Sequence, residues 1–419
     1  MIQGKCRIWN LCISALAFLS LYNIIITLKL LYAPECLRHS PPLPKPTVKI
    51  IRRPCEKDEK AIYTKQVMNL NLQLGRWDMR LQYKLFDHIV TGEKFAILSE
   101  LFRTCLATQS SIEKIASIIE VSNHWNGPIS LAIFAASEDE LNTLLLYVMY
   151  LRKCDARIRD KVSFHLAIPK DKRPKKVAID IEKLDEMDCG NPMGTLQSLI
   201  KKLQKQNGMW RMKMPYPQNL MRNLARKNCQ SKFVFLTDVD IIPNKGMAES
   251  LDVFLINAKC KGLCAYVIPT YEIDERVRFP PNKTELIRLA NRGLARPFHH
   301  KVFIYNQYAT NFSRWQNATN ERDEVHINHP VTNFEFLYEP FYVAPDTVPL
   351  HDERFVGYGY TRNSQVYEMY VAGYEFLVLS PIFTCHWGLQ IKRTRPPWRE
   401  HQNNLNRKNF DGFKTGNLC

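Results

Sequence analysis

The chain has 419 residues, more than one hydrophobic core usually supports, so we expect one large folded domain, or two tightly joined halves, together with a non-globular end. Hydrophobic residues make up 45% and charged residues 24%, which excludes a wholly disordered or fibrous chain. The formal charge of +17 suits nucleic acid, anionic membranes or phosphate-bearing small molecules. The sequence contains no zinc-finger spacing, aromatic RNA-binding signature or dense basic arm, so nucleic acid is not expected as a partner.

The first element of the chain is an apolar segment, Ile8 to Leu28, which contains no charged residue. Roughly 20 such residues are enough to cross a bilayer as a helix. Lys5 and Arg7 precede the segment, and the positive-inside rule therefore places the N-terminus in the cytosol. Lys29 to Tyr32 follow it where a cleaved signal peptide would have a small-residue site. We interpret the segment as an uncleaved signal anchor, with residues 1–7 as a cytosolic tail and the remaining chain luminal.

The cysteines and glycosylation sequons agree with a luminal position. Ten of the twelve cysteines follow the anchor, an even set that permits disulfides in an oxidising compartment. Cys260 and Cys264 lack the Cys-x-x-Cys partners of a zinc site, so we interpret them as structural. Asn-x-Ser/Thr sequons occur at Asn282, Asn311 and Asn317.

Residues 29–60 are predicted to form a stem. Six prolines lie among basic residues here, a composition that favours extended polyproline conformations over packing. The mixed pattern from Ala61 to Lys94 favours helix. We expect residues 61–419 to form the luminal domain, with its core at about 101–392.

A regular alternation of apolar runs and amphipathic stretches starts near Leu101. The predicted elements are a strand at Phe102–Ala107, a helix at Ser111–Val121, a strand at Ile129–Ala135, a helix at Glu138–Leu151 and a strand at Val162–Ile168. Strands that alternate with helices predict an α/β fold with a mostly parallel central sheet and helices on both faces. In such sheets, ligands bind beyond the carboxyl ends of the strands.

The strongest local signal is the apolar strand Lys232-Phe-Val-Phe-Leu-Thr, which runs directly into Asp238-Val-Asp240. Residues two apart in an extended chain point the same way, so the two carboxylates can converge on one cation. Burying two like charges is costly unless a cation compensates them. A hard metal such as Mn²⁺ or Mg²⁺, also bound by the diphosphate of a nucleotide sugar, would do so. An isolated Asp-x-Asp is usually a solvated turn, but after a buried strand of an alternating α/β chain it predicts a metal site.

A predicted helix that starts after Pro217 leads into this strand. Its polar residues Asn219, Arg222, Asn223 and Arg226 fall at helical spacing and share one face. Such a face can bind phosphate or a nucleoside, and the alternative is a solvated polar face.

A second pair of carboxylates, Asp352 and Glu353, precedes the glycine-rich turn Gly357-Tyr358-Gly359. Glycine allows a backbone to approach a ligand closely. An inverting sugar transfer needs a carboxylate that removes the proton of the acceptor hydroxyl as its oxygen attacks the anomeric carbon. We predict Asp352 as this base and Glu353 as the alternative, while a salt bridge from Asp352 to Arg354 is the structural interpretation.

A histidine, His386, follows the apolar stretch Glu375 to Phe383, which is predicted to be a late strand. Histidine is a common metal ligand, but a lone histidine is more often a core or surface residue. These residues alone leave its role open.

Seven motifs carry a family resemblance. They are His124–Pro128, Asn219–Arg226, Thr237–Asp240, Asn282–Lys283, Phe312–Trp315, Glu339–Ala344 and Asp352–Phe355. Together they resemble the β-1,4-glucuronyltransferase family, which includes the C-terminal catalytic domain of the LARGE-type bifunctional glycosyltransferases. The match runs from roughly Leu101 to His386 and is more specific than any single motif.

The resemblance implies a GT-A fold, a Golgi type II topology and inverting transfer of glucuronic acid from UDP-glucuronic acid. In the family the acceptor is a xylose on the O-mannosyl glycan of dystroglycan, and the new linkage is β-1,4. The expected partners are therefore a nucleotide sugar, a glycan acceptor on a glycoprotein and the Golgi membrane. A complex with other glycosyltransferases is left open.

Carried over by motif, the resemblance implies that Asp238 and Asp240 bind the metal, Mn²⁺ or alternatively Mg²⁺, and that His386 is an additional ligand. It also implies a uridine pocket that includes Thr108, Gln109 and Ser110 at the end of the first strand. The donor is further expected to contact Asp238 and the helix face formed by Asn219, Arg222 and Asn223.

The sequence departs from the family at Trp387 and Leu389, where close relatives carry a lysine and an aromatic residue. That lysine could contact an acidic group of donor or acceptor. Arg292, Arg296 and Lys392 are candidates for binding the glucuronate carboxylate, because guanidinium groups bind carboxylates in a bidentate manner.

Three alternatives to a glucuronyltransferase remain open on sequence. The first keeps the fold and uses another donor sugar, xylose or N-acetylglucosamine. The second is an inactive glycan-binding or scaffolding paralogue, although the presence of the predicted metal ligands argues against it. The third is a hydrolase, whose paired carboxylates would act without a strand-end metal site.

Overall fold

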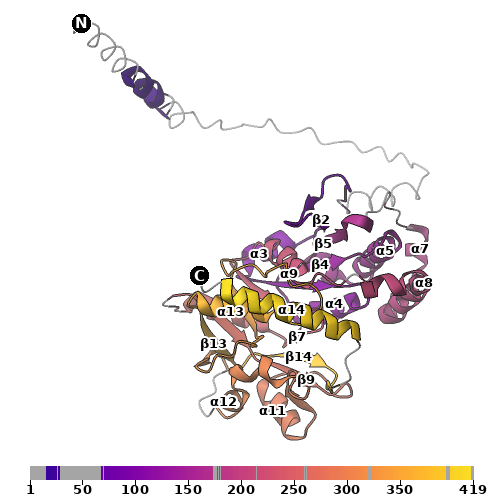
Figure 1. Cartoon of the computed structure of the whole chain (residues 1–419), viewed down its shortest axis with the longest axis vertical. Helices are drawn as coiled ribbons and strands as arrows, with labels where there is room; N and C mark the ends of the chain where they lie inside the picture. Colours follow the sequence, from indigo (N-terminus) through magenta and orange to yellow (C-terminus); the bar gives the residue numbers. More distant parts are fainter. Residues whose placement is uncertain are drawn as a thin grey trace, which may run out of the picture. The chain divides into compact units, whose positions relative to one another are not determined.

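The computed structural model describes residues 16–25, 27–28, 68, 70–172, 177, 179, 181–213, 215–258, 260, 262–318, 323–392 and 397–416. The chain forms two compact units, Met1–Cys55 and Glu56–Cys419 (Figure 1).

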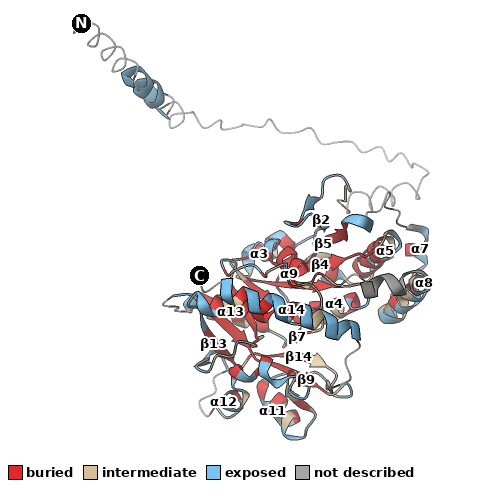
Figure 2. Cartoon of the chain, viewed as in Figure 1, coloured by how far each residue is buried: buried red, intermediate tan, exposed pale blue. Residues whose placement is uncertain are grey.

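In the first unit, residues 16–25 and 27–28 are helical, and their large apolar side chains are exposed (Figure 2). The rest of the predicted anchor, the predicted tail and the predicted stem lie outside the described residues. Among the helices that the structure describes, none has both the length and the apolar character needed to span a membrane. The anchor and stem therefore stay predictions.

A ten-stranded sheet lies at the centre of the described part of the second unit. From one edge to the other, its strands are β1 (Arg76–Trp77), β2 (Tyr83–Val90), β5 (Val162–Pro169), β4 (Ile129–Phe134), β3 (Thr104–Ser110), β6 (Phe233–Leu236), β12 (Phe341–Pro345), β8 (Cys264–Ile268), β13 (Glu375–Ser380) and β11 (His326–Pro330). Only β2, β12 and β11 run against the other described strands of this sheet. The sheet is thus mixed and mostly parallel, as the alternating pattern predicted.

Helices cover both faces of the parallel strands β5, β4, β3 and β6. One face is covered by α4 (Ile118–His124), α5 (Glu138–Cys154), α6 (Ala156–Lys161) and α10 (Met247–Asn257), and the other by α9 (Gln218–Lys227). Side chains alternate along β4, so Leu131 and Ile133 pack on the α5 side while Ala132 lies under α9. Ala107 and Ala132 belong to the same buried cluster as Ala225 of α9, and these small side chains let α9 pack close to the sheet. Because both faces are covered, these strands are buried along nearly their whole length.

Helix α5 shows why the local sequence forms a helix. Its N-cap residue Ser137 accepts a hydrogen bond from the backbone of Glu140. Acidic residues occupy its first turn, and Arg152 and Lys153 occupy its last turn, which complements the helix dipole.

The second half of the described domain adds a four-stranded sheet in the order β10 (Ala295–Pro297), β9 (Thr270–Ile273), β14 (Thr384–Trp387) and β7 (Ile242–Pro243). A second hydrophobic core, which contains the fully buried Trp315, lies between the strands and the helices of this half. The remaining helices of at least five residues are α3 (Phe95–Leu101), α7 (Ile181–Glu186), α8 (Pro192–Lys213), α11 (Lys283–Asn291), α12 (Phe312–Gln316), α13 (Asn363–Val371) and α14 (Pro397–Gly416).

Most predicted elements are present with shifted ends. The helix predicted at Ser111–Val121 is a short 3₁₀ turn followed by α4, and the late strand predicted at Glu375–Phe383 is β13, which ends at Ser380. The helix prediction for Ala61–Lys94 is wrong where the structure describes it. The apolar residues of this segment form β2 instead, because they pair antiparallel with β5 at one side of the sheet.

Among the described cysteines, three disulfides join Cys105 to Cys229, Cys154 to Cys189 and Cys260 to Cys264. The last pair confirms the structural interpretation of Cys260 and Cys264. The first pair ties β3 to the residues that follow α9, so it closes a loop around the parallel strands. Among the described cysteines, Cys385 is a buried free thiol.

Candidate functional site

The two carboxylates of the Asp-x-Asp motif lie in a turn directly after β6. The backbone N–H of Ile241 donates to the carbonyl of Asp238, so the motif is not extended. Asp238 and Asp240 consequently contact two different sets of side chains. Both keep part of their side-chain surface exposed, 26% for Asp238 and 30% for Asp240.

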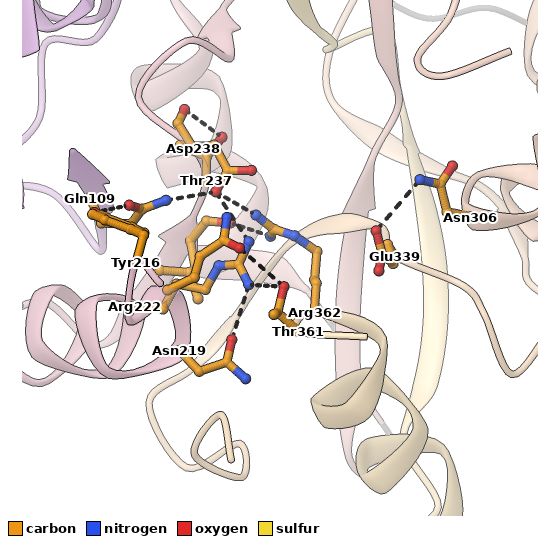
Figure 3. A network of polar contacts seen from close by, with 12 residues as sticks. Gln109, Tyr216, Asn219, Arg222, Thr237, Asp238, Asn306, Glu339, Thr361 and Arg362 are labelled. Carbon is orange, nitrogen blue, oxygen red and sulfur yellow. Dashed lines mark hydrogen bonds and ion pairs between the residues drawn. The ribbon is translucent and has the colours of Figure 1, made fainter. Parts of the chain in front are cut away.

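Asp238 is paired with two buried arginines (Figure 3). Its Oδ1 accepts hydrogen bonds from Arg362 Nη2 at 3.0 Å, Arg222 Nη2 at 3.3 Å and Gln109 Nε2 at 3.2 Å. Burial would raise the pKa of this carboxyl, but Arg362 and Arg222 outweigh it and hold the pKa below its usual value. Burial and the neighbouring Arg362 lower the pKa of Arg222 to about 10. Asp238 is therefore the shared counter-ion of two guanidinium groups that are almost fully buried.

Asp240 faces the other side of the site. Its Oδ2 lies 3.1 Å from Lys114 Nζ and 3.7 Å from His386 Nε2. Burial opposes ionisation here too, but His386 and Lys114 hold the pKa of Asp240 far below its usual value. The structure thus brings His386 to Asp240, while Asp238 is held by the arginines.

The positions of Asp240 and His386 fit a shared divalent cation. Two neighbouring ligands at about 2.1 Å from one metal ion lie about 3 Å apart, close to the observed 3.7 Å. Among the described residues, no cluster of three or more His, Cys, Asp or Glu side chains is placed to hold a metal by itself. A cation here would need further oxygen ligands, which a diphosphate and water can supply. Metal binding by Asp238, Asp240 and His386 stays a prediction.

The residues predicted for the uridine pocket lie on the buried strand β3. Gln109 bridges Asp238 and Tyr216, whose hydroxyl donates to Gln109 Oε1. Thr108 Oγ1 is buried and has no hydrogen-bond partner among the described residues, whereas Ser110 donates to the carbonyl of Ser111. Only Gln109 of these three contacts the carboxylates, and the nucleotide-binding role of all three stays a prediction.

The polar face of α9 is buried against the loop that precedes α13. Asn219 donates to the carbonyl of Asp352 at 2.9 Å, and Asn223 exchanges hydrogen bonds with the backbone of His351. Arg226 binds the carboxylate of Asp346 and carbonyls of the same loop. Their contacts give these residues a structural role, and only Arg222 on this face reaches the Asp-x-Asp turn.

The two predicted bases lie in this loop, and both carboxylates are already bound. Asp352 accepts hydrogen bonds from the guanidinium and backbone of Arg354, which is the structural alternative that the sequence suggested. Glu353 accepts one from Asn223 at 2.9 Å, and burial raises its pKa. The assignment of either residue as the base stays a prediction.

The glycine-rich turn after this loop contacts α14. Gly357 has a φ of +80°, and a Cβ there would lie 2.5 Å from Gln402 Oε1. Asn406 donates to the carbonyls of Val356, Tyr358 and Gly359. The glycines thus allow a close approach of the turn to the C-terminal helix.

The sequence did not single out Arg362, Lys114, His299 or Glu339 as members of the site. Burial and the neighbouring His386 lower the pKa of His299 to about 4, so its imidazole is neutral at physiological pH. No local pattern indicates Arg362 or Lys114. Glu339 had a signal, because it is a carboxylate next to a buried apolar strand, as Asp238 is.

The three basic residues predicted to contact the glucuronate carboxylate differ in how exposed they are and in the contacts they already make. Arg296 binds the fully buried carboxylate of Glu272, and it also donates to the carbonyl of Gln390. Arg292 and Lys392 have exposed side chains.

A cavity of about 320 Å³ lies next to β10. It is lined by Phe298, Gln307, Asn311, Arg314 and neighbouring residues, and none of the predicted catalytic, donor or metal residues lines it.

Comparisons with known proteins cover this site. A family model described as a glycosyl-transferase for dystroglycan matches residues 103–417. The chain is 33% identical over 326 residues to β-1,4-glucuronyltransferase 1 of Bos taurus, covering 74% of this chain and 74% of that protein. The β-1,4-glucuronyltransferase 1 of Danio rerio is 29% identical over 350 residues, covering 81% and 80%.

More distant similarity extends to larger proteins. The chain is 26% identical over 283 residues to the xylosyl- and glucuronyltransferase LARGE1 of Homo sapiens, covering 67% of this chain and 30% of that protein. Among solved structures, GalNAc-T7 crystallised with UDP, GalNAc and Mn²⁺ aligns with a TM-score of 0.39 at 8% identity, covering 75% of this chain and 49% of that one.

Proposed function

The chain belongs to the family of glycosyl-transferases for dystroglycan, and we propose that it is an inverting glucuronyltransferase. It would transfer glucuronic acid from UDP-glucuronic acid in β-1,4 linkage to a xylose-terminated O-mannosyl glycan. The observation that carries this proposal is the family match, which includes the Asp-x-Asp turn, α9 and His386, together with 33% identity to a β-1,4-glucuronyltransferase. A GT-A fold is part of the same proposal.

We propose that Asp240 and His386, with a contribution from Asp238, hold a Mn²⁺ ion, for which Mg²⁺ is the alternative. Bound there, the cation would offset the negative charge that develops on the leaving UDP. The protein's own cationic side chains already contact both carboxylates. Arg222 and Arg362 fix Asp238, and Lys114 contributes a positive charge beside Asp240.

A panel of donors tests the activity. We expect the luminal region to release UDP from UDP-glucuronic acid when a β-xyloside and Mn²⁺ are present, and a chelator to abolish this release. Product mass then identifies the transferred sugar. Transfer of xylose or N-acetylglucosamine would agree with a glycosyltransferase but overturn the assignment of glucuronic acid as the donor sugar. No turnover with any donor would favour a binding or scaffolding role.

We further propose a Golgi membrane localisation, with residues 8–28 as a type II anchor and the catalytic domain in the lumen. Support comes from the three disulfides, which persist in oxidising compartments. Protection of the catalytic domain from protease in sealed Golgi vesicles, and its loss on detergent treatment, would be the expected result. Digestion in intact vesicles would contradict this topology.

A further inference from the structure

The sheet places Glu339 at the same end as the Asp-x-Asp turn. Strand β12 runs antiparallel to β6, with Tyr342 opposite Leu236. Extended past the last pair, this register brings the residues before β12 toward the residues after β6. Glu339 therefore lies at the same end of the sheet as Asp238, 101 positions earlier in the chain, and in Figure 3 its carboxylate is set apart from Asp238 and joined to Asn306.

The backbone of Glu339 is held firmly. Its N–H donates to the carbonyl of Asn306 at 2.8 Å, and its carbonyl accepts a hydrogen bond from Gln307 Nε2 at 2.8 Å. Pro340 follows and restricts its conformation further. A side chain on a fixed backbone next to the site can be positioned accurately against a substrate.

The carboxylate of Glu339 has few partners of its own. Within the described residues it accepts one long hydrogen bond, 3.5 Å from Asn306 Nδ2, and it forms no salt bridge. The same Asn306 nitrogen lies 2.7 Å from His299 Nδ1, while the buried Asn306 Oδ1 has no hydrogen-bond partner in the part of the chain that the structure describes. Asp352 and Glu353, by contrast, are bound at short distance by Arg354 and Asn223.

Burial and the neighbouring arginines shift the pKa of Glu339 in opposite directions. Burial raises its pKa, Arg362 and Arg222 lower it, and Asp238 raises it, with a net increase. Both arginines are also shared with Asp238. A carboxylate with a pKa above its usual value is a stronger base than an ordinary carboxylate, which is a property a general base needs.

From this geometry we propose that Glu339 is the carboxylate that takes the proton from the acceptor hydroxyl. The proposal rests on the proposed function and assigns its base to Glu339 in place of Asp352 or Glu353. As the acceptor oxygen forms its bond to the anomeric carbon, the bond from that carbon to the phosphate oxygen breaks and its electron pair leaves with UDP. The hydroxyl proton passes to the Glu339 carboxylate, so atoms and charge balance.

The test measures the kinetics of Glu339→Gln. We expect kcat to fall by about 100-fold to 10,000-fold while the KM for the nucleotide sugar stays within about two-fold. In the wild-type enzyme, kcat/KM should fall as pH drops through the raised pKa of Glu339, because the protonated acid cannot accept a proton. This acidic limb should be lost from the residual activity of the variant.

Rescue separates catalysis from structure. We expect formate to restore part of the activity of Glu339→Ala, since a small carboxylate can enter the space that the side chain leaves. The matched control is Glu335→Gln, a nearby glutamate in the same loop, which should retain wild-type kcat and pH dependence. A merely structural role of Glu339 would give no formate rescue and would leave the acidic limb in place.

Other outcomes overturn the assignment. Near wild-type kcat in Glu339→Gln, with a large loss in Asp352→Asn or Glu353→Gln, would return the role to one of those residues. The wild-type enzyme in the same assay separates this failure from failure of the proposed function. If the wild type transfers another sugar, the donor assignment fails and Glu339 is tested on that donor, because every such transfer requires removal of the acceptor proton.

Discussion

Asp240→Ala is expected to abolish sugar transfer while leaving the fold intact. Asp240 lies in a turn, and its ammonium partner Lys114 is largely exposed, so its removal leaves no buried ammonium group uncompensated. A lost metal ligand would remove stabilisation of the leaving diphosphate, and we expect kcat to fall by roughly 1,000-fold or more. The measurements are turnover in saturating Mn²⁺, Mn²⁺ binding by calorimetry, and urea unfolding.

The control for this experiment is Asp139→Ala, an exposed aspartate in the first turn of α5, which should keep full turnover and Mn²⁺ affinity. His386→Ala should weaken Mn²⁺ binding in the same direction as Asp240→Ala. Near wild-type turnover of Asp240→Ala in added Mn²⁺ would refute the metal assignment. Loss of turnover together with unfolding would instead show that Asp240 supports the fold.

Asp238→Asn is expected to lower the free energy of unfolding by about 3 kcal/mol. The change keeps the size of the side chain but leaves Arg222 and Arg362, each under 5% exposed, without their negative partner. Breaking a buried ion pair costs about 3–5 kcal/mol, and the partial exposure of Asp238 places this case at the lower end. Urea unfolding at pH 7 measures the difference.

Lowering the pH provides a second check on Asp238. Because the folded state depresses the pKa of Asp238 below its ordinary value of 3.8, the carboxylate stabilises the fold above that value. This contribution is lost as pH falls through the depressed pKa, so the wild type and Asp238→Asn should converge in stability at acidic pH. A difference that is small at pH 7, or that does not change with pH, would show that the arginines do not depend on Asp238.

The matched control is Asp274→Asn. Asp274 pairs with Arg276, whose side chain is 82% exposed, so water can replace the lost partner and little change in stability is expected. The comparison thus separates the effect of a buried pair from the general effect of losing a negative charge on a strongly basic chain. It also distinguishes the two aspartates of one motif, since Asp240 is predicted to affect activity and Asp238 to affect both activity and stability.

Local pattern in the sequence predicted the alternation of strands and helices between β3 and β5. It also predicted the strand β6 and the two carboxylates that follow it. These features depend on residues a few positions apart. The spacing of their apolar residues shows whether a strand or helix is buried on one face or on both. The polar face of α9 was predicted in the same way, from polar residues at helical spacing. The sequence suggested a ligand as the partner of this face, whereas in the structure it contacts a loop of the protein itself.

The tertiary structure decided how the side chains are shared within the site. Asp238 and Arg362 are 124 positions apart, and Asp240 and Lys114 are 126 apart, so no local pattern relates them. Insertion of the antiparallel strand β12 between β6 and β8 places Glu339, just before β12, at the same end of the sheet as the turn after β6. The sequence alone thus determined which charged residues directly follow a buried strand, because a buried strand is recognisable from its local run of apolar residues. Which of those charges are neutralised, and which remain available for a metal or a proton, depends on contacts that only the folded chain makes.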